Sequence, residues 1–166
     1  MMTEFQAEPS ACIPDTRFQA FFGRWAVRRR ILDRLTGSIQ SFTGVAHVEP
    51  DRFVEEGRFD SGSGSFISRR GYRLSWQGGN LSVRFPGGPH FITLGADATQ
   101  PVRHLCGTDI YCGRFFFRSP DHWAEFWQVT GPRKNYVSLA HYLRPGSGET
   151  VFAQPSFCHQ VEFADG

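Results

Sequence analysis

Apolar and polar residues alternate along most of this chain from residue 24 onward, and this two-residue period restricts its fold more than any other feature. The pattern recurs in RWAVRRRIL, YRLSW, NLSVRF, HWAEFWQV and NYVSLAHYLR. Side chains two residues apart point to the same face of a β-strand, and these stretches are rich in the β-branched and aromatic residues that strands favour. The pattern therefore predicts an all-β protein.

Polar turns containing Gly, Pro, Asn or Asp separate these stretches at intervals of roughly 8–14 residues, which indicates about ten strands. Such short connections leave no room for the crossover helices that parallel strands need, so we expect an antiparallel meander. A sheet of this size exposes unpaired edges unless it closes on itself. We therefore expect a closed, up-and-down antiparallel barrel of about 8–10 strands, wide enough to hold a small ligand.

One short helix is expected over residues 15–22, in the stretch PDTRFQAFFG. Asp15 or Thr16 is suited to cap its start, and Gly23 to stop it. Three phenylalanines spaced i, i+3 and i+4 give the helix one apolar face. These are Phe18, Phe21 and Phe22. The helix is predicted to plug one mouth of the barrel.

The chain divides into three parts by composition. Residues 1–14 are interpreted as an N-terminal tail and residues 15–145 as the barrel domain. Residues 146–166 form a C-terminal extension that either adds a last strand or lies along the surface. The N-terminal stretch is polar and resembles neither a signal peptide nor a membrane span, so we expect a cytoplasmic protein without membrane association.

Charge and cysteine content exclude several classes of function. The formal net charge is +2, and the basic residues are mixed with acidic ones, so nucleic-acid binding is not expected. The four cysteines form no C-x-x-C pair, which argues against a structural zinc site and favours free thiols in a reducing compartment. No cofactor is predicted, and a homodimer is left open.

The densest group of chemically versatile side chains lies in HLCGTDIYCG, at residues 104–113. A tight hairpin at Gly107 would bring His104 close to Asp109 and Tyr111. Asp109 would then orient the imidazole, and His104 would face a ligand as an acid, a base or a hydrogen-bond donor. In the alternative interpretation, Asp109 caps the turn and His104 is an ordinary core residue.

A metal site is the third interpretation of this group. His104 and Cys106 share a strand face and could provide two ligands, with His90 or Glu56 as a distant third. The spacing fits no known zinc pattern, so no metal is predicted. Haem held by a single histidine is also not indicated by the sequence.

Two other charged groups are candidates for ligand binding. Arg133 and Lys134 in GPRKNY would receive a carboxylate or phosphate at a barrel mouth, or else form a solvated turn. Glu55 and Glu56 lie on opposite faces of one strand, so one of them faces the lumen and needs a cation, for which Arg70 or Arg114 is available. In the alternative interpretation, the strand curves at Gly57 and both glutamates are half-exposed. Of the two, Glu56 is assigned to the ligand site.

The start of the barrel resembles the lipocalin and calycin proteins. A short helix is followed by Gly23-x-Trp25 at the beginning of the first strand. In those barrels the indole closes one end, often beneath an arginine from the last strand. The resemblance therefore implies structural roles for Gly23 and Trp25, and it makes Arg144 the candidate for that arginine.

Several longer stretches resemble an uncharacterised bacterial family, the domain of unknown function numbered 6314. They are EEG at 55–57, FPGGPHF at 85–91, HLCGTDIYCGRF and WQVTGPRKNY. The resemblance runs from about Phe21 to Arg144 and excludes both ends of the chain. It implies a barrel without an established activity and assigns no catalytic residues.

Two functions remain at this point. The first is a barrel that binds a small, anionic or amphipathic ligand at a polar lumen site, with no chemistry. The second is a small enzyme, an isomerase, lyase or hydrolase, that uses His104, Asp109 and Tyr111 as its acid–base group. The abundant aromatic residues are core in either case, and some would line a cavity.

Overall fold

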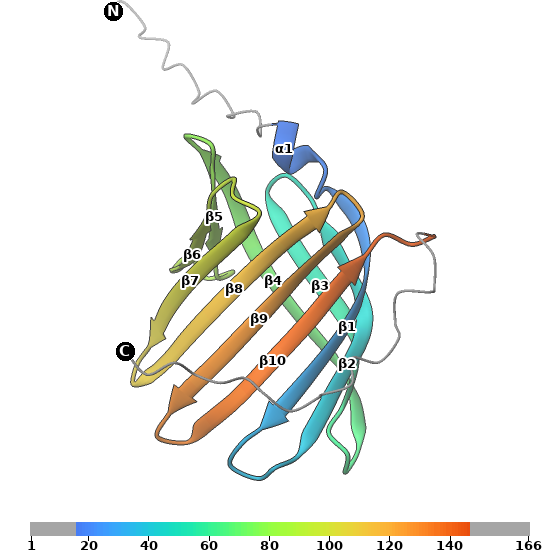
Figure 1. The fold of residues 1–166 in the computed structure, drawn as a ribbon, viewed down its shortest axis with the longest axis vertical. Helices are drawn as coiled ribbons and strands as arrows, with labels where there is room; N and C mark the ends of the chain where they lie inside the picture. Colours follow the sequence, from blue (N-terminus) through green and yellow to red (C-terminus); the bar gives the residue numbers. More distant parts are fainter. Residues whose placement is uncertain (1–15, 147–166) are drawn as a thin grey trace, which may run out of the picture.

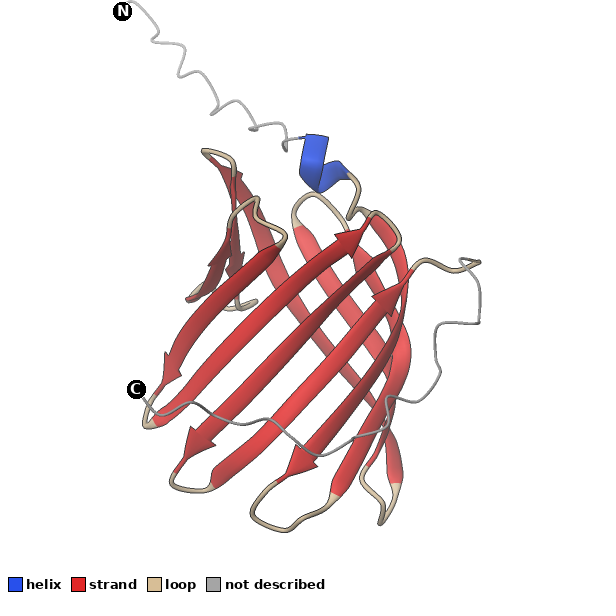
Figure 2. Cartoon of the chain, in the orientation of Figure 1, coloured by secondary structure: helices blue, strands red, loops and turns tan. Residues whose placement is uncertain are grey.

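The computed structural model describes residues 16–146, and strands make up nearly all of this part of the chain (Figures 1 and 2). The elements are α1 (Thr16–Gln19), β1 (Gly23–Asp33), β2 (Ile39–Val48), β3 (Arg52–Asp60), β4 (Ser65–Gln77), β5 (Asn80–Arg84), β6 (His90–Leu94), β7 (Thr99–Cys106), β8 (Asp109–Ser119), β9 (His122–Gly131) and β10 (Lys134–Leu143). The expected tail at 1–14 and nearly all of the expected extension at 146–166 lie outside the described residues. No helix in the described part is long and apolar enough to cross a membrane.

The ten strands form one antiparallel sheet in the order β6-β5-β4-β3-β2-β1-β10-β9-β8-β7. Strands that are neighbours in sequence pair with each other, except β6 and β7, and β1 also pairs with β10, for example Arg29 opposite Ala140. The first and last strands therefore join the two halves of the meander, and the sheet curves into the barrel seen in Figure 1. The predicted all-β, antiparallel, up-and-down architecture is confirmed.

The barrel is nearly closed rather than closed, which corrects the expectation of full closure. β6 and β7 face each other at the two ends of the sheet order without forming a ladder. β5 and β6 have only five residues each, and the ladder between them is irregular after Val83. Pro101 in β7 lacks an N–H, which suits an edge strand. A side-chain hydrogen bond links the two strands across this seam: Nδ1 of His104 donates to the carbonyl oxygen of Phe91 at 3.1 Å.

The N-terminal helical segment is much shorter than the expected helix over 15–22. It comprises a single turn, and the amides of Phe21 and Phe22 bond to carbonyls three residues back instead of four. At Gly23 the backbone then takes a φ of +108°, a region that other residues rarely adopt, and β1 begins. The aromatic side chains still gather at this mouth of the barrel, where Phe18 is buried against Trp76 and Phe21 packs on Phe117.

Trp25 is fully buried beneath this turn, and two contacts fix its position. Its indole nitrogen donates to the carbonyl oxygen of Phe21 at 2.9 Å. The guanidinium of Arg144 lies 3.9 Å from the centroid of its ring, in cation–π contact. Arg144 also donates to the carbonyl oxygen of Ala20. A Cβ at Gly23 would come within 2.9 Å of the Arg144 guanidinium, so the glycine leaves room for this contact.

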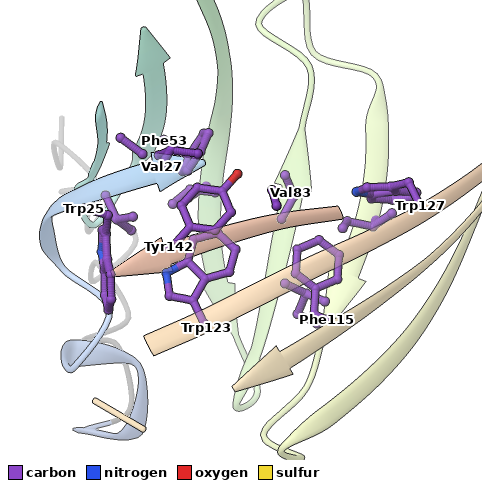
Figure 3. Packing of buried hydrophobic residues seen from close by; sticks show 14 of the residues in the cluster. Trp25, Val27, Phe53, Val83, Phe115, Trp123, Trp127 and Tyr142 are labelled. Carbon is purple, nitrogen blue, oxygen red and sulfur yellow. The ribbon is translucent and has the colours of Figure 1, made fainter. Parts of the chain in front are cut away.

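From this end a stack of aromatic rings leads into the barrel (Figure 3). Trp25 meets Trp123 edge to face at 6.1 Å, and Trp123 lies parallel to Tyr142 with ring centroids 3.6 Å apart. The Trp123 nitrogen has no hydrogen-bond partner among the described residues, and Figure 3 shows it on the side facing Trp25. The face of the Trp25 ring can accept this N–H weakly. The stack ends at the Tyr142 hydroxyl, deep in the lumen.

Replacing Trp25 with Ala should lower the free energy of unfolding by about 3–5 kcal/mol, the usual cost of truncating a buried aromatic side chain. Chemical denaturation monitored by circular dichroism measures the change. Leu105→Ala is the control, because Leu105 is 60% exposed and its truncation should cost little. A loss below about 1 kcal/mol for the Trp25 variant would contradict its role in closing the barrel.

Candidate functional site

A cluster of charged side chains lies inside the barrel, contributed by five strands. The members are Arg29 of β1, Glu55 of β3, Arg70 of β4, Glu125 of β9 and Tyr142 of β10. We call these five residues the lumen cluster. Each lies on the inward face of its strand, where these hydrogen bonds are made. The cluster therefore ties together strands that lie far apart in the sheet.

Arg29 and Arg70 both bind the same two carboxylates. Arg29 donates to Glu55 at 2.7 and 2.9 Å and to Glu125 at 3.0 Å. Arg70 donates to Glu55 at 3.0 and 3.3 Å and also to Glu125. Both arginines also donate to the Tyr142 hydroxyl oxygen, which lies 2.8 Å from Glu55 and 3.0 Å from Glu125. Two positive and two negative charges meet here, so the cluster is close to neutral.

Small residues make room for these long side chains. Ala140 lies between Arg29 and Glu125 in the register of β1, β10 and β9, and Ala46 lies opposite Glu55 on β2. Both alanines are fully buried. Larger side chains at these positions would occupy the space in which the guanidinium and carboxylate groups meet.

The charges shift one another's pKa values. Burial alone would raise the pKa of Glu125, but the charges of Arg70 and Arg29 and hydrogen bonds from Arg70 and Trp127 outweigh it, and the pKa falls to about 2. Glu55 shows the same balance: burial opposes ionisation, yet Arg70 and Arg29 lower its pKa. Burial raises the pKa of Tyr142 well above its ordinary value. Both carboxylates are therefore ionised at neutral pH, and Tyr142 keeps its proton.

A cavity opens beside the lumen cluster, with an empty volume of about 740 Å³ that includes its part open to solvent. Its wall is almost wholly apolar. The lining residues are Phe18, Phe21, Val48, Phe53, Arg70, Tyr72, Leu74, Trp76, Leu81, Val83, Phe91, Ile92, Leu94, Phe115, Phe117, Trp123, Glu125 and Trp127. Of the lumen cluster, only Arg70 and Glu125 reach this wall.

Arg70 is the member of the cluster that can contact a bound molecule. Its side chain is 31% exposed, whereas that of Glu55 is 2% exposed. Nε and Nη2 of Arg70 make all of its hydrogen bonds to the cluster, and Nη1 makes none to any of residues 16–146. A guanidinium has five N–H donors, so the two on Nη1 remain for a ligand.

Flat aromatic rings form one side of the cavity. Phe91 stacks on Tyr72 at 5.3 Å with an angle of 6° between the rings, and on Trp127 at 5.4 Å with an angle of 22°. Trp127 lies across Gly113, where a Cβ would come within 2.6 Å of its ring. Glycine at this position therefore allows the indole to lie flat against β8, which gives the cavity a planar wall.

The hairpin predicted at residues 104–113 is present, but its polar groups do not form a triad. His104 lies opposite Tyr111 in the register, with ring centroids 6.2 Å apart, and it packs on Phe91 at 4.9 Å. Its only hydrogen bond within the described chain is the one to Phe91 across the seam. Asp109 instead pairs with Lys134 at 2.7 Å, and Lys134 also donates to the Tyr111 hydroxyl at 3.1 Å.

The proposed acid–base group is therefore divided between two places. His104 belongs to the seam between β6 and β7. Asp109, Tyr111 and Lys134 lie near the turns at the end of the barrel away from α1 (Figure 1). The sequence did not predict that Lys134 joins this group, because its ion-pair partner Asp109 lies on another hairpin.

Three other expected site residues lie outside the lumen. Glu56 is on the outer face, with its side chain 60% exposed and 3.9 Å from Arg69, so Glu55 and not Glu56 is the inward carboxylate. His90 is exposed and bonds to the Thr93 hydroxyl at 2.9 Å. Arg133 is exposed on the turn between β9 and β10. Strand alternation explains the placement of the two glutamates. Glu55 shares its strand face with Phe53 and Phe59, which point inward, so Glu56 points outward.

No three His, Cys, Asp or Glu side chains in the described residues lie close enough together to hold a metal ion. Cys106 and Cys112 are free and exposed. His104 and Cys106 occupy the same strand face, but neither approaches His90 or Glu56 in a shared ligand set.

Sequence reasoning missed most of the lumen cluster, although a signal was present. Arg29 shares its strand face with Trp25, Val27 and Ile31, and Glu125 falls between Trp123 and Trp127. An ionisable residue in the middle of an apolar strand face must be buried with a partner of opposite charge. Two arginines and two glutamates in such positions would have pointed to the cluster.

The sequence matches the model of the "Family of unknown function (DUF6314)" over residues 21–144. The chain belongs to this family. The resemblance seen in the sequence is thus confirmed over nearly the whole DUF6314 barrel. No curated protein matches this DUF6314 chain at a significant level.

Solved structures show the same fold at low sequence identity. The S-type phycobiliprotein lyase CPES from Guillardia theta superimposes with a TM-score of 0.56 and 13% identity, covering 79% of the DUF6314 chain and 92% of the lyase. A protein of unknown function from the DUF3598 family of Nostoc punctiforme gives a TM-score of 0.51 at 12% identity, covering 82% of this chain and 51% of that one. These similarities show that the barrel fold is shared, and they assign no activity.

Acid should destabilise the DUF6314 barrel through the lumen cluster. The pKa of Glu125 is about 2 in the folded chain, against an ordinary value of 4.5, so protons bind more tightly to the unfolded chain. The stabilising contribution of Glu125 is complete above its pKa in the unfolded chain, and it is lost as the pH falls from about 5 towards 2. Glu125→Gln should therefore reduce the slope of unfolding free energy against pH in this window.

Urea denaturation at a series of pH values measures that slope, and Glu56→Gln is the control because Glu56 lies exposed on the outer face. Glu55 keeps part of the pH dependence in the Glu125 variant, so the slope decreases but does not vanish. Equal slopes for the wild-type protein and Glu125→Gln would show that the cluster does not hold Glu125 ionised.

Proposed function

We propose that this barrel binds a small, largely apolar molecule with flat rings, and that a hydrogen-bond acceptor or anionic group of this molecule contacts Arg70. The observation that carries the proposal is an aromatic cavity in which Nη1 of one partly exposed arginine, Arg70, still has free donors. Such a pocket matches the usual composition of small-molecule sites, which combine an apolar wall with a few placed polar groups.

The cavity wall favours the apolar part of the ligand. The rings of Tyr72, Phe91 and Trp127 present broad planar faces, and aromatic pairs are stabilised beyond the effect of buried area alone. The rest of the wall is almost wholly apolar, which suits a ligand whose larger part is apolar.

The lumen cluster favours a ligand with one polar end. Its charges balance internally, so it does not need an anion for its own neutrality. The cluster does hold Arg70 in a fixed orientation, with Nη1 directed away from its carboxylate partners. A carboxylate, sulfonate or carbonyl oxygen would therefore meet a preorganised donor without displacing an existing bond. This agrees with an anionic or amphipathic ligand.

The fold comparison is compatible with this proposal. One structure with the same fold is named an S-type phycobiliprotein lyase. The enzyme alternative, with His104, Asp109 and Tyr111 as an acid–base group, stays a prediction. Because Asp109 pairs with Lys134 while His104 bonds to Phe91, binding without chemistry is the function that the geometry favours.

Filling the cavity should abolish binding of an apolar aromatic probe. Val83 is buried in the wall, so Val83→Trp would occupy the space that N-phenyl-1-naphthylamine would enter. We expect the fluorescence increase of this neutral dye with the wild-type protein to be lost in the variant. Thr43→Trp, which adds the same side chain to an exposed outer position, should bind as the wild type does. Unchanged binding by Val83→Trp would place the dye elsewhere.

The role of Arg70 can be separated from that of the apolar wall with a charged dye of similar shape. Arg70→Lys keeps the positive charge but removes the guanidinium fork. The variant should bind 8-anilinonaphthalene-1-sulfonate about tenfold more weakly, since a charge-assisted hydrogen bond is lost, and the neutral dye equally well. Arg114→Lys on the outer face of β8 is the matched control. Equal weakening of both dyes would mean that the sulfonate does not contact Arg70.

A further inference from the structure

A long stretch of the chain carries basic residues without any acidic ones. Residues 61–96 contain four arginines and one histidine, and no Asp or Glu. These residues span β4, β5 and β6. Arg70 points inward and is neutralised by the lumen cluster, but the other arginines of this stretch are exposed.

The sheet register collects these charges into one row on the outer surface. Arg52 lies opposite Arg73, Arg73 opposite Arg84, and Arg84 opposite His90, across β3, β4, β5 and β6. We call these four residues the basic row. All four are exposed. Side chains directly opposite on neighbouring strands have Cβ atoms about 4.5–5.5 Å apart, so the guanidinium groups can reach a common ligand.

Hydroxyl groups border the basic row on one side. The next outward-facing row towards the β4–β5 turn consists of Ser75, Ser82 and Thr93, which lie opposite one another in the same register. The surface therefore combines planar cationic donors with neutral hydroxyl donors, and no carboxylate comes from β4, β5 or β6.

Two arginines of the basic row are held in place by their own contacts. Arg52 forms a two-bond ion pair with Glu49, at 2.8 and 2.9 Å. Nη1 of Arg84 donates to the carbonyl oxygen of Gly88 at 3.1 Å. Arg73, between them, has no ion pair or side-chain hydrogen bond with any of residues 16–146. Glu49 balances one charge at the end of the row, and no carboxylate of residues 16–146 pairs with Arg73 or Arg84.

Like charges directly opposite each other on neighbouring strands destabilise a sheet. A bound anion between Arg73 and Arg84 would turn this repulsion into attraction, and arginine forks match the oxygen geometry of phosphate. We propose that the outer face of β4–β6 is a binding site for a phosphate-bearing anion, with Arg73 and Arg84 as its principal ligands and His90 and the bordering hydroxyls beside them.

The phosphate could belong to a soluble molecule or to a lipid headgroup, since both present the same oxygens. The site lies on the opposite face of β4–β6 from the cavity lining, so it does not depend on the small-molecule function proposed above. Binding of the naphthylamine dye and binding of phosphate are expected to be independent.

Isothermal titration calorimetry of the full chain with inorganic pyrophosphate, at low ionic strength, tests the soluble source. Co-sedimentation with phosphatidylglycerol vesicles, compared with phosphatidylcholine vesicles, tests the headgroup. Arg73→Gln and Arg84→Gln should each weaken the interaction about tenfold, because each removes charge-assisted hydrogen bonds to phosphate. Arg114→Gln removes the same charge from the outer face of β8 and should leave binding unchanged.

Binding in either assay that is lost in the Arg73 and Arg84 variants, but kept in Arg114→Gln, supports the site, and the responding assay identifies its source. Equal weakening in all three variants would mean that only net charge matters, and it would overturn the proposal. Lack of binding in both assays would also overturn it. Thermal melting of each variant shows whether it is folded, which is expected because all three side chains are exposed.

Discussion

The lumen cluster is the interaction on which the rest of this structure depends. Arg29 and Arg70 each bind both Glu55 and Glu125, so one set of contacts joins β1, β3, β4 and β9 across the interior. A buried pair of this kind gains little over an apolar core, but the loss of one partner leaves a charge uncompensated. The cluster therefore favours the register in which these strands bring the four charges together.

The cluster also divides the interior into two regions with different properties. On the α1 side, the stack from Trp25 through Trp123 to Tyr142 fills the space and closes the barrel. On the side of β4–β8, the aromatic walls leave a cavity open, and Arg70 presents a free donor to it. The incomplete pairing between β6 and β7 lies on this open side, where His104 provides a hydrogen bond across the seam. Trp123 belongs to both regions, because it stacks on Tyr142 and also lines the cavity.

The outer surface follows from the same alternation that builds the lumen. In β4, Arg70 and Tyr72 point inward, so Arg69 and Arg73 must point outward. A chain with a net charge of only +2 can therefore still carry a concentrated basic row, because pairing places residues from separate strands side by side. Mixed charges along the sequence do not imply mixed charges on each face.

The sequence by itself determined the all-β class, the antiparallel meander, the family and the closing positions of Gly23, Trp25 and Arg144, because these depend on local period, turns and short motifs. It predicted the hairpin that places His104 opposite Tyr111 for the same reason. Only the tertiary structure decided that Asp109 pairs with Lys134, that β6 and β7 stay unpaired, and that Arg29 and Glu125 join Glu55 and Arg70. Those contacts join residues from distant strands, and the register and curvature that bring such residues together are properties of the whole sheet, not of any segment.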